Sequence, residues 1–302
     1  MAASALSRLL ERQAVELSQL TDREVAAVLR ALEDGRRELA ERLRSLPASN
    51  GYSTYQLRVA LLTTEEGIKQ IRARMGVILD EAVSRAQQRA AEDLVAVLEQ
   101  AEPDFRGAAP GLEVPVLQRL AAEQGLLLHR HSLDRYSAEM LTRLQASLVQ
   151  SRVQRMTWNQ AIDRIMAREG GVLAGGRARA ELIVRMEHMR TYDAAHQADL
   201  ERAAELLDEP DDDDPLLARA DEYADNRNHP LSRALDGRTR PVRGVWRVQA
   251  AEVAAWAAKL KRPVTGILWQ RQGADYVGST YPAHYNDRGR QTPWRASWAD
   301  RS

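Results

Sequence analysis

The residues best suited to chemistry lie near the C-terminal end, in the stretch YPAHYNDRGRQTPWRASW from Tyr281 to Trp298. The segment from Asp225 to Pro230 has a similar character, because it too holds a His close to Pro, Asn and Arg. Imidazole and carboxylate groups together could form a metal site or a general acid–base pair. A metal-dependent hydrolase or nuclease is therefore one interpretation, with its site at Asp225, His229, His284 and Asp287.

The spacing of these residues matches no established catalytic signature. The chain has no HExxH, GxSxG or Walker A motif. His129 and His131 are two residues apart and cannot share a helix face. A His beside Pro in a loop more commonly fixes a turn by bonding to a backbone carbonyl. We therefore expect no catalytic residues, no metal, no cofactor and no enzymatic activity.

A basic C-terminal segment offers a second interpretation, a DNA-binding packaging factor. Beyond Pro215 the chain has fifteen Lys and Arg against eight Asp and Glu, although the whole chain balances at 43 of each. Arginine binds phosphate well, but this series lacks the interleaved aromatic residues of a stacking platform. The alternative is a solvated, partly salt-bridged face. The series comprises Arg227, Arg233, Arg238, Arg240, Arg243 and Arg247.

Composition narrows the class of protein. Without cysteine, the 302-residue chain has no disulfide, thiol nucleophile or Cys-ligated zinc. No apolar run approaches the ~20 residues of a membrane span. The charged N-terminus does not resemble a signal peptide, so we expect a cytosol-like compartment and no membrane partner.

Apolar residues at three- and four-residue steps predict helices over residues 1–102 and in a second block over 116–170. Thr21 and Glu24 have capping-box spacing, which predicts a helix start. We expect a second helix from about Ser53 and a third ending near Gln100. Gly35 and Gly67 interrupt the heptad pattern, which favours a bundle over an intermolecular coiled coil. Gly125 and the His129/His131 pair are expected to interrupt the second block.

The last region, 177–302, begins with a helix from Arg177 to about Leu207, followed by an acidic loop at 208–215. Short strands are expected at 245–248 and 263–269, a helix at 252–260 and a turn at Asp236-Gly237. The fold class is therefore mostly α, with a long N-terminal helical bundle followed by a small α+β C-terminal module. In the leading helix, the expected buried stripe is Leu182, Ile183, Met186, Met189 and Tyr192, and the other faces carry Arg185, Glu187, His188 and Asp193.

The helix segment ELIVRMEHMRTYDAA, the residues Asp225–His229 with Leu235-Asp236-Gly237, and the loop Pro282–Arg290 form three motifs in order. In type and order they resemble those of the phage Mu protein F-like, or phage head morphogenesis (minor capsid), family. The helix ELIVRMEHMRTYDAA is similar to the family's Ile-Ala-Arg-Thr-Glu…Tyr-Asn helix. The family's D-x-R-x-x-H…L-D-G segment is matched loosely by Asp225-Asn226-Arg227-Asn228-His229 and Leu235-Asp236-Gly237, with the His closer to the Arg than in the family. A Pro-x-His-x-Asn-x-Arg loop follows; many relatives have Cys in that loop, where this chain has Asp287 and Gly289. The matching residues are Arg185, Glu187, Asp225, Arg227, His229, Asp236, Gly237, Pro282, His284, Asn286, Arg288, Arg290 and Trp294.

The resemblance implies a non-catalytic structural protein of the virion, located in the capsid interior or at the portal vertex, and in the host cytoplasm during assembly. Its expected partners are the portal protein, the major capsid or scaffolding protein, and DNA through the Arg-rich module, and oligomerisation on the portal is expected. It would act in capsid assembly, with a role in genome packaging or DNA ejection. The C-terminal loop is then a clasp, in which His284, Asn286 and Arg288 bond to the Asp225–Gly237 segment while Trp294 and Trp298 pack on the sheet.

Overall fold

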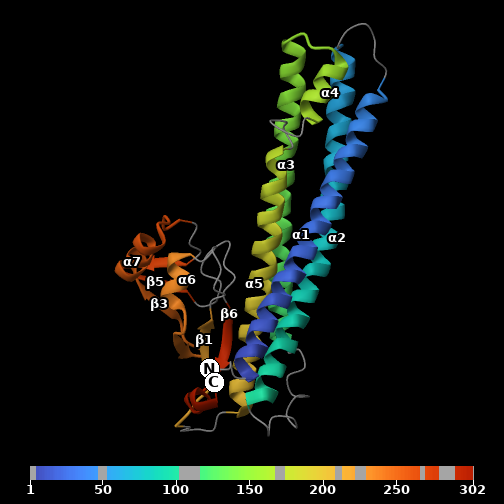
Figure 1. Ribbon diagram of the computed structural model, residues 1–302. Coiled ribbons are helices and arrows are strands. Elements are labelled where there is room, and N and C mark those ends of the chain that lie inside the picture. Colours follow the sequence, from blue (N-terminus) through green and yellow to red (C-terminus); the bar gives the residue numbers. More distant parts are fainter. Residues whose placement is uncertain are drawn as a thin grey trace. The chain divides into compact units, whose positions relative to one another are not determined.

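The computed structural model describes residues 5–46, 53–101, 116–166, 174–207, 213–221, 229–265, 269–278 and 290–301. The chain is mostly helical, with a long N-terminal helical region and a C-terminal part that contains small antiparallel sheets (Figure 1). This confirms the predicted fold class.

The helical region contains α1 (Ala5–Arg44), α2 (Thr54–Ala101), α3 (Val116–Val153), α4 (Trp158–Met166) and α5 (Ala174–Leu207). The C-terminal part contains β1 (Leu217–Asp221), α6 (Pro230–Leu235), β2 (Thr239–Pro241), β3 (Trp246–Gln249), α7 (Ala250–Leu260), β4 (Gln270–Gln272), β5 (Asp275–Gly278), β6 (Arg290–Trp294) and the 3-10 helix η3 (Ala296–Arg301).

Two compact units are assembled from separated segments of the chain. The first comprises residues 1–21, 83–125 and 185–302, and the second comprises 22–82 and 126–184. Helices α1, α2, α3 and α5 each contribute to both. No described helix is both long enough and apolar enough to cross a membrane.

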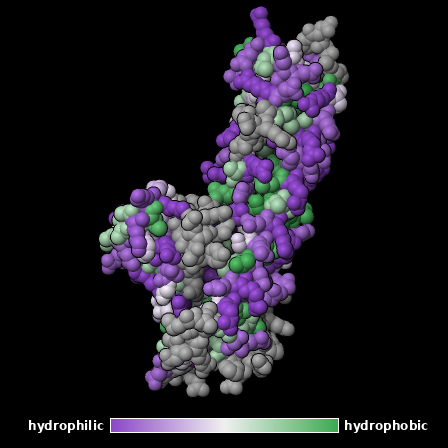
Figure 2. Space-filling view, viewed as in Figure 1, coloured by the Kyte–Doolittle hydropathy of each residue, from purple (hydrophilic) through white to green (hydrophobic). Residues whose placement is uncertain are grey.

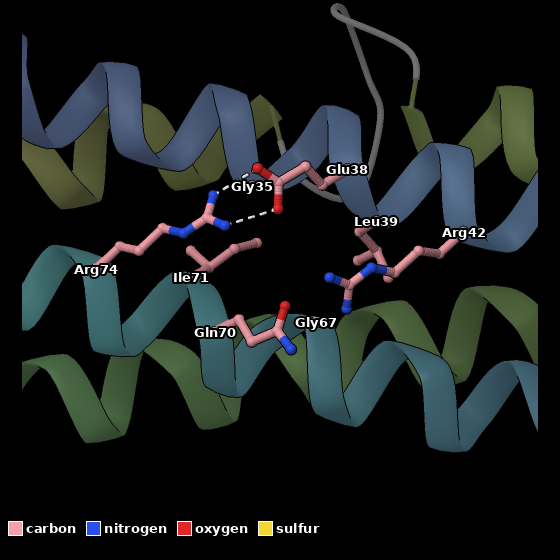
Figure 3. Close-up of a pocket in the computed structure, with 8 residues that line it drawn as sticks. All are labelled: Gly35, Glu38, Leu39, Arg42, Gly67, Gln70, Ile71 and Arg74. Atoms are coloured by element: carbon pink, nitrogen blue, oxygen red, sulfur yellow. Dashed lines mark hydrogen bonds and ion pairs between the residues drawn. The ribbon is translucent and has the colours of Figure 1, made fainter.

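The second unit is a helical bundle with one continuous apolar core, to which α1, α2, α3, α4 and α5 all contribute buried residues. Two glycines let α1 and α2 approach closely, as Figure 3 shows. A Cβ built on Gly35 would lie 2.3 Å from Cγ1 of Ile71, and one on Gly67 would lie 2.7 Å from Cδ1 of Leu39. Each glycine therefore receives a large side chain of the facing helix. Beside this contact, Arg74 donates two hydrogen bonds to Glu38, at 2.7 and 2.8 Å.

The first unit contains the C-terminal sheets. One has the strand order β2-β1-β6 and the other β3-β5-β4, with every pair antiparallel. Alternation along β1 buries Ala218 and Ala220 completely. Ala218 and Ala220 belong to an apolar core that also contains Leu231 of α6, Trp246 of β3 and Trp298 of η3, together with Leu98 of α2 and Leu200 of α5.

The helices of the first hundred residues are longer than the sequence predicted. The capping box at Thr21 and Glu24 is wrong, because α1 continues through both residues, and the Thr21 hydroxyl donates to the carbonyl of Leu17. The separate second and third helices are one helix, α2. Likewise, α3 runs without interruption past Gly125 and the His129/His131 pair. Tertiary packing overrides weak local stop signals in long helices.

Several C-terminal elements also differ from the predicted ones. The strand at Trp246 and the turn at Gly237, with φ of +75°, are confirmed. The strand predicted over 263–269 is wrong at residues 263–265 and at Trp269, which are not in a strand, and β4 begins at Gln270. Strands β1 and β6 and helix α6 lie in segments that were expected to be turns and loops. Pro293 is tolerated in β6 because β6 is an edge strand.

Candidate functional site: a buried polar junction

Several polar residues of α5 lie inside the first unit, not on its surface. Glu187, His188 and Asp193 were expected on the faces of the helix outside its buried stripe, but their exposed fractions are only 3%, 1% and 2%. The expectation fails because α5 contacts partners on more than one side. Tyr192 packs with Leu17 and Ala90 of α1 and α2, while Gln197 donates to the carbonyl of Val242 beside the sheet.

Asp93 of α2 is the centre of a polar cluster that is buried except at Glu16 and Arg89. We call it the Asp93 junction, and it is formed by Gln13, Glu16, Arg89, Asp93, Tyr192 and Arg290. The Tyr192 hydroxyl donates to Oδ2 of Asp93 at 2.8 Å. Arg89 lies 2.7 Å from Oδ1 of Asp93 and also binds Glu16 at 2.6 Å. Gln13 donates to the main-chain carbonyl of Asp93 at 2.9 Å. The junction therefore joins α1, α2 and α5.

Arg290 connects the sheet to the same junction. It is the first residue of β6 and is only 5% exposed. Its guanidinium donates to the carbonyl of Leu10 and to Oε1 of Gln13, and lies 3.9 Å from Oδ2 of Asp93. A buried cation retained in this way has its charge partly offset by a carboxylate and by carbonyl dipoles. Arg290 thus fixes the start of β6 against α1 and α2.

Burial controls the protonation of the groups around the junction. Burial raises the pKa of Asp93, although the neighbouring Arg89 and Arg290 oppose that shift. Burial, and then the charge of Asp93, raise the pKa of Tyr192. His196 stacks on the Tyr192 ring with a centroid distance of 5.7 Å, and burial lowers its pKa to about 4. His196 is therefore neutral near pH 7, which keeps an additional positive charge away from Arg290.

A second buried arginine, Arg240 of β2, holds the turn that follows its own strand. It donates to the carbonyls of Pro241 and Gly244, both at 2.9 Å, and to that of Val242. It also donates to Oε1 of Gln197 at 2.7 Å. Its guanidinium lies 5.0 Å from the centre of the Trp246 ring. Arg240 is 5% exposed, so the expectation of a solvated or phosphate-binding Arg240 is wrong.

The other described motif residues also have structural contacts. His229 is the N-cap of α6, where Nδ1 accepts a hydrogen bond from the Leu231 N–H at 3.2 Å. It fixes a local structure as expected, but by accepting a bond. Asp236 pairs with Arg233, and Gly237 adopts the positive φ that the turn requires. Trp298 is 1% exposed, which confirms its predicted burial, while Trp294 is partly buried.

Part of the predicted site lies outside the described residues: Asp225, Arg227, Pro282, His284, Asn286, Asp287 and Arg288. The predicted contact of His284, Asn286 and Arg288 with the Asp225–Gly237 segment therefore lies outside the described residues as well. Arg185 is partly buried and Glu187 fully buried. Among the described residues, no group of three His, Asp or Glu side chains is placed to hold a metal ion.

Sequence reasoning missed most of the Asp93 junction. Asp93 itself carried a usable signal, because it follows Ala86 and Ala90 at helical spacing and precedes Leu94, all of which are buried. A carboxylate on a buried stripe must be paired, which predicts nearby arginines but not which ones. Arg290 is 197 positions further along the chain, and no local pattern links it to Asp93.

Comparison with known proteins gives no relative: no family model, curated protein or solved structure matches the chain. The class that the fold defines is a mostly helical protein with two small antiparallel sheets and a buried polar junction at its helix–sheet contact.

Proposed function

We propose that this chain is a structural minor head protein of a tailed phage, which acts at or near the portal during procapsid assembly and contributes to genome packaging or ejection. The observation that supports this proposal best is the burial of Arg290 and its contacts with two helices. The motif that contains it resembles the closing loop of head morphogenesis proteins, and Arg290 is buried in contacts with α1 and α2. A motif arginine used in this way favours a structural role over a reactive one.

The same reasoning applies to the other described motif residues. His229 caps helix α6. Gly237 permits the turn that precedes β2, where its N–H donates to the carbonyl of Ala220 in β1. A general base or metal ligand must present its polar atom to a substrate or ion. These residues instead shape the backbone of the module. The candidate hydrolase loses support at His229, the one member of its set that is described.

The DNA-binding alternative also loses support from the contacts of its arginines. Arg240 is buried, and three others are engaged by acidic side chains: Arg233 by Asp236, Arg238 by Glu252 and Arg243 by Glu205. Arg247 is exposed. Exposed ion pairs are weak and can rearrange, but they lower the net charge that a phosphate backbone would meet.

Co-purification with the cognate portal protein at physiological salt tests the proposal. We expect the full-length chain to co-elute with the portal in size-exclusion chromatography. Two full-length, folded proteins that elute separately over a range of concentrations would refute the proposal. Arg271→Gln removes one exposed charge of β4 and is the control, which should co-elute like the wild-type chain.

The rival activity needs its own assay. The purified chain is analysed for bound metal and is incubated with DNA in the presence of Mg²⁺ or Mn²⁺. Turnover that is lost in His229→Ala but retained in Arg271→Gln would favour the hydrolase. Absence of turnover together with portal binding would favour the structural role.

A further inference from the structure

Four helix ends meet at one end of the second unit, at the top of Figure 1. Arg152, near the end of α3, donates to the Thr54 hydroxyl at the start of α2 at 2.7 Å. The Trp158 indole of α4 donates to the carbonyl of Leu43 in α1 at 2.9 Å. The end of α1, the start of α2, the end of α3 and the start of α4 therefore form one end of this unit.

This end of the unit is strongly basic, although the whole chain is neutral. Its described segments contain six arginines, no lysine and only two acidic residues: 41–46, 53–58 and 149–166. Asp163 pairs with Arg44 at 3.1 Å, and the formal charge of Glu41 balances that of the adjacent Arg42. The four remaining arginines define the surface that we call the basic end: Arg58, Arg152, Arg155 and Arg164.

The chain itself does not neutralise the arginines of the basic end. Arg152 donates to a hydroxyl, and Arg164 donates to a side-chain amide oxygen and a thioether sulfur, all of which are uncharged. Arg58 and Arg155 are exposed. Among the residues that the structure describes, no carboxylate pairs with any of these four side chains. Their charge is therefore available to an acidic partner.

Large apolar side chains are exposed at the same helix ends. Tyr55 is 75% exposed, Val153 76% and Val149 44%. Each lies within one helical turn of an arginine of the basic end. Figure 2 shows hydrophobic residues among hydrophilic ones at this end. The basic end is therefore a mixed surface of arginines and apolar side chains.

This mixture indicates the class of partner. Tyrosine and arginine are enriched in protein–protein contacts and frequently contribute most of the binding energy. A phosphate backbone would use the arginines, but exposed valines contribute nothing to phosphate binding. A protein segment that carries both carboxylates and apolar side chains would use every component of the surface. Charge and hydrophobicity together therefore favour an acidic, partly apolar protein segment.

The backbone at Arg155 provides an independent observation. The N–H of Arg155 donates to the carbonyl of Arg152 and the N–H of Met156 to that of Ser151, both at 3.0 Å, which is the Schellman pattern of a helix end. Glycine is the usual residue at this position because φ is positive there, and Arg155 has φ of 54°. An arginine is less stable than glycine in this conformation. Strained residues of this kind are common at binding sites, so an exposed Arg155 supports an interaction.

We propose that the basic end binds a segment of a different protein in which carboxylates lie next to apolar side chains. Its carboxylates pair with Arg58 and Arg155, because planar guanidinium groups suit bidentate pairing. Its apolar side chains cover Tyr55 and Val153. The electrostatic part of this binding weakens as salt rises. The inference does not depend on the proposed function, because it names a chemical class of partner and not the portal.

Fluorescence anisotropy with the full-length chain and three short labelled peptides tests the proposal. The first peptide contains Glu and Leu in equal number, the second has Ser in place of Leu, and the third has Gln in place of Glu. At about 50 mM salt the Glu/Leu peptide should bind about tenfold more tightly than either of the others, since only it supplies both charge and apolar surface. Its affinity should fall towards about 1 M salt, where the Debye length is about 3 Å.

Charge reversal locates the electrostatic part of the site. Arg58→Glu with Arg155→Asp should weaken binding of the Glu/Leu peptide by about tenfold or more, since like charges then face each other. Asp is chosen for position 155 because it tolerates the left-handed conformation. Arg23→Glu with Arg30→Glu reverses the same number of charges at exposed positions of α1 and is the matched control, with an affinity within about twofold of the wild-type value.

The apolar part has its own test. Tyr55→Ser with Val153→Ser should reduce the affinity for the Glu/Leu peptide to that for the Glu/Ser peptide, and should leave binding of the Glu/Ser peptide unchanged. Amide exchange needs no substitution: the bound Glu/Leu peptide should slow exchange within residues 53–58 and 149–158. Arg155→Gly should melt no lower than the wild-type chain while it binds this peptide more weakly, a combination that a purely structural Arg155 would not produce.

Three results would overturn the proposal: a wild-type chain that binds the three peptides equally, an Arg58→Glu/Arg155→Asp variant that binds like the Arg23→Glu/Arg30→Glu control, or slower exchange only outside the two named segments. Tighter binding of duplex DNA than of the Glu/Leu peptide, lost in Arg58→Glu/Arg155→Asp, would assign the basic end to nucleic acid instead.

Discussion

The hydroxyl of Tyr192 donates a 2.8 Å hydrogen bond to Oδ2 of Asp93, a residue 99 positions earlier in the chain, and both side chains are almost fully buried. This bond joins α5 to α2 within the first unit. Asp93 also accepts from Arg89, and Arg290 lies nearby, so one carboxylate links two helices and a strand. Its partners are what make a buried negative charge tolerable.

Tyr192→Phe should lower the free energy of unfolding by about 1.5–3 kcal/mol, because it removes a hydrogen bond to a charged group and keeps the ring. Urea denaturation followed by circular dichroism measures the loss. Tyr55→Phe removes an exposed hydroxyl and is the control, with a change within about 0.5 kcal/mol. Equal effects of the two substitutions would mean that the Tyr192–Asp93 bond contributes nothing.

Glycine substitutions in the helical unit should separate close packing from helix propensity. Gly→Ala in a helix normally stabilises by up to about 1 kcal/mol. Gly76→Ala meets no atom within 4 Å and should raise the melting temperature. Gly35→Ala and Gly67→Ala insert a methyl group against Ile71 and Leu39 and should each cost about 1–3 kcal/mol. Thermal melts that rank all three variants above the wild-type chain would contradict the close approach of α1 and α2.

Asp214 caps the start of η3. Its Oδ1 accepts from the Ala296 N–H at 2.7 Å and its Oδ2 from the Ser297 N–H at 3.1 Å. Asp214→Ala should cost about 1 kcal/mol, the usual effect of losing such a cap. The exposed neighbour Asp213→Ala is the matched control. Faster amide exchange at Ala296 and Ser297 in Asp214→Ala alone would localise the effect, whereas equal exchange in both variants would exclude the cap.

The sequence predicted the helical region well because long amphipathic periods are a local signal. It placed the end of α1 and the start of α2 within a few residues, since Pro47 and Gly51 stop a helix. It failed for β1 and β6, which are short and pair with each other across more than 60 intervening residues. Strand formation there depends on a partner that no local window contains.

The polar junction could be anticipated only in part, for a similar reason. Glu187, His188 and Asp193 occupy polar positions of an otherwise ordinary amphipathic helix, so they were expected outside its buried stripe. Their burial arises because α5 contacts α1 and α2 on one side and Arg240 and Val242 on another, so that more than one of its faces is covered. A buried arginine such as Arg240 is equally hidden in sequence, because its partners are backbone carbonyls, which have no sequence signature.

Two buried groups of α5 should give the first unit an unusual response to pH, because they oppose each other. Burial lowers the pKa of His196 to about 4 from 6.5, so its contribution to stability is complete above pH 6.5 and is lost as pH falls towards 4. Burial raises the pKa of Asp199 to about 7 from 3.8, so its contribution is complete below pH 3.8 and is lost as pH rises towards 7. Each amounts to about 3–4 kcal/mol at most.

Between about pH 4 and 6.5 the changes in unfolding free energy due to His196 and to Asp199 should therefore largely cancel. Burial also raises the pKa of Asp93, so Asp93 changes the stability with pH in the same direction as Asp199. Asp199→Asn should leave a protein that loses stability as pH falls through this range. His196→Gln should leave one that loses stability as pH rises through it. Urea denaturation at a series of pH values measures both slopes, with exposed His131→Gln as the control. Parallel pH profiles in Asp199→Asn and His196→Gln would show that neither group titrates differently in the folded and unfolded chain.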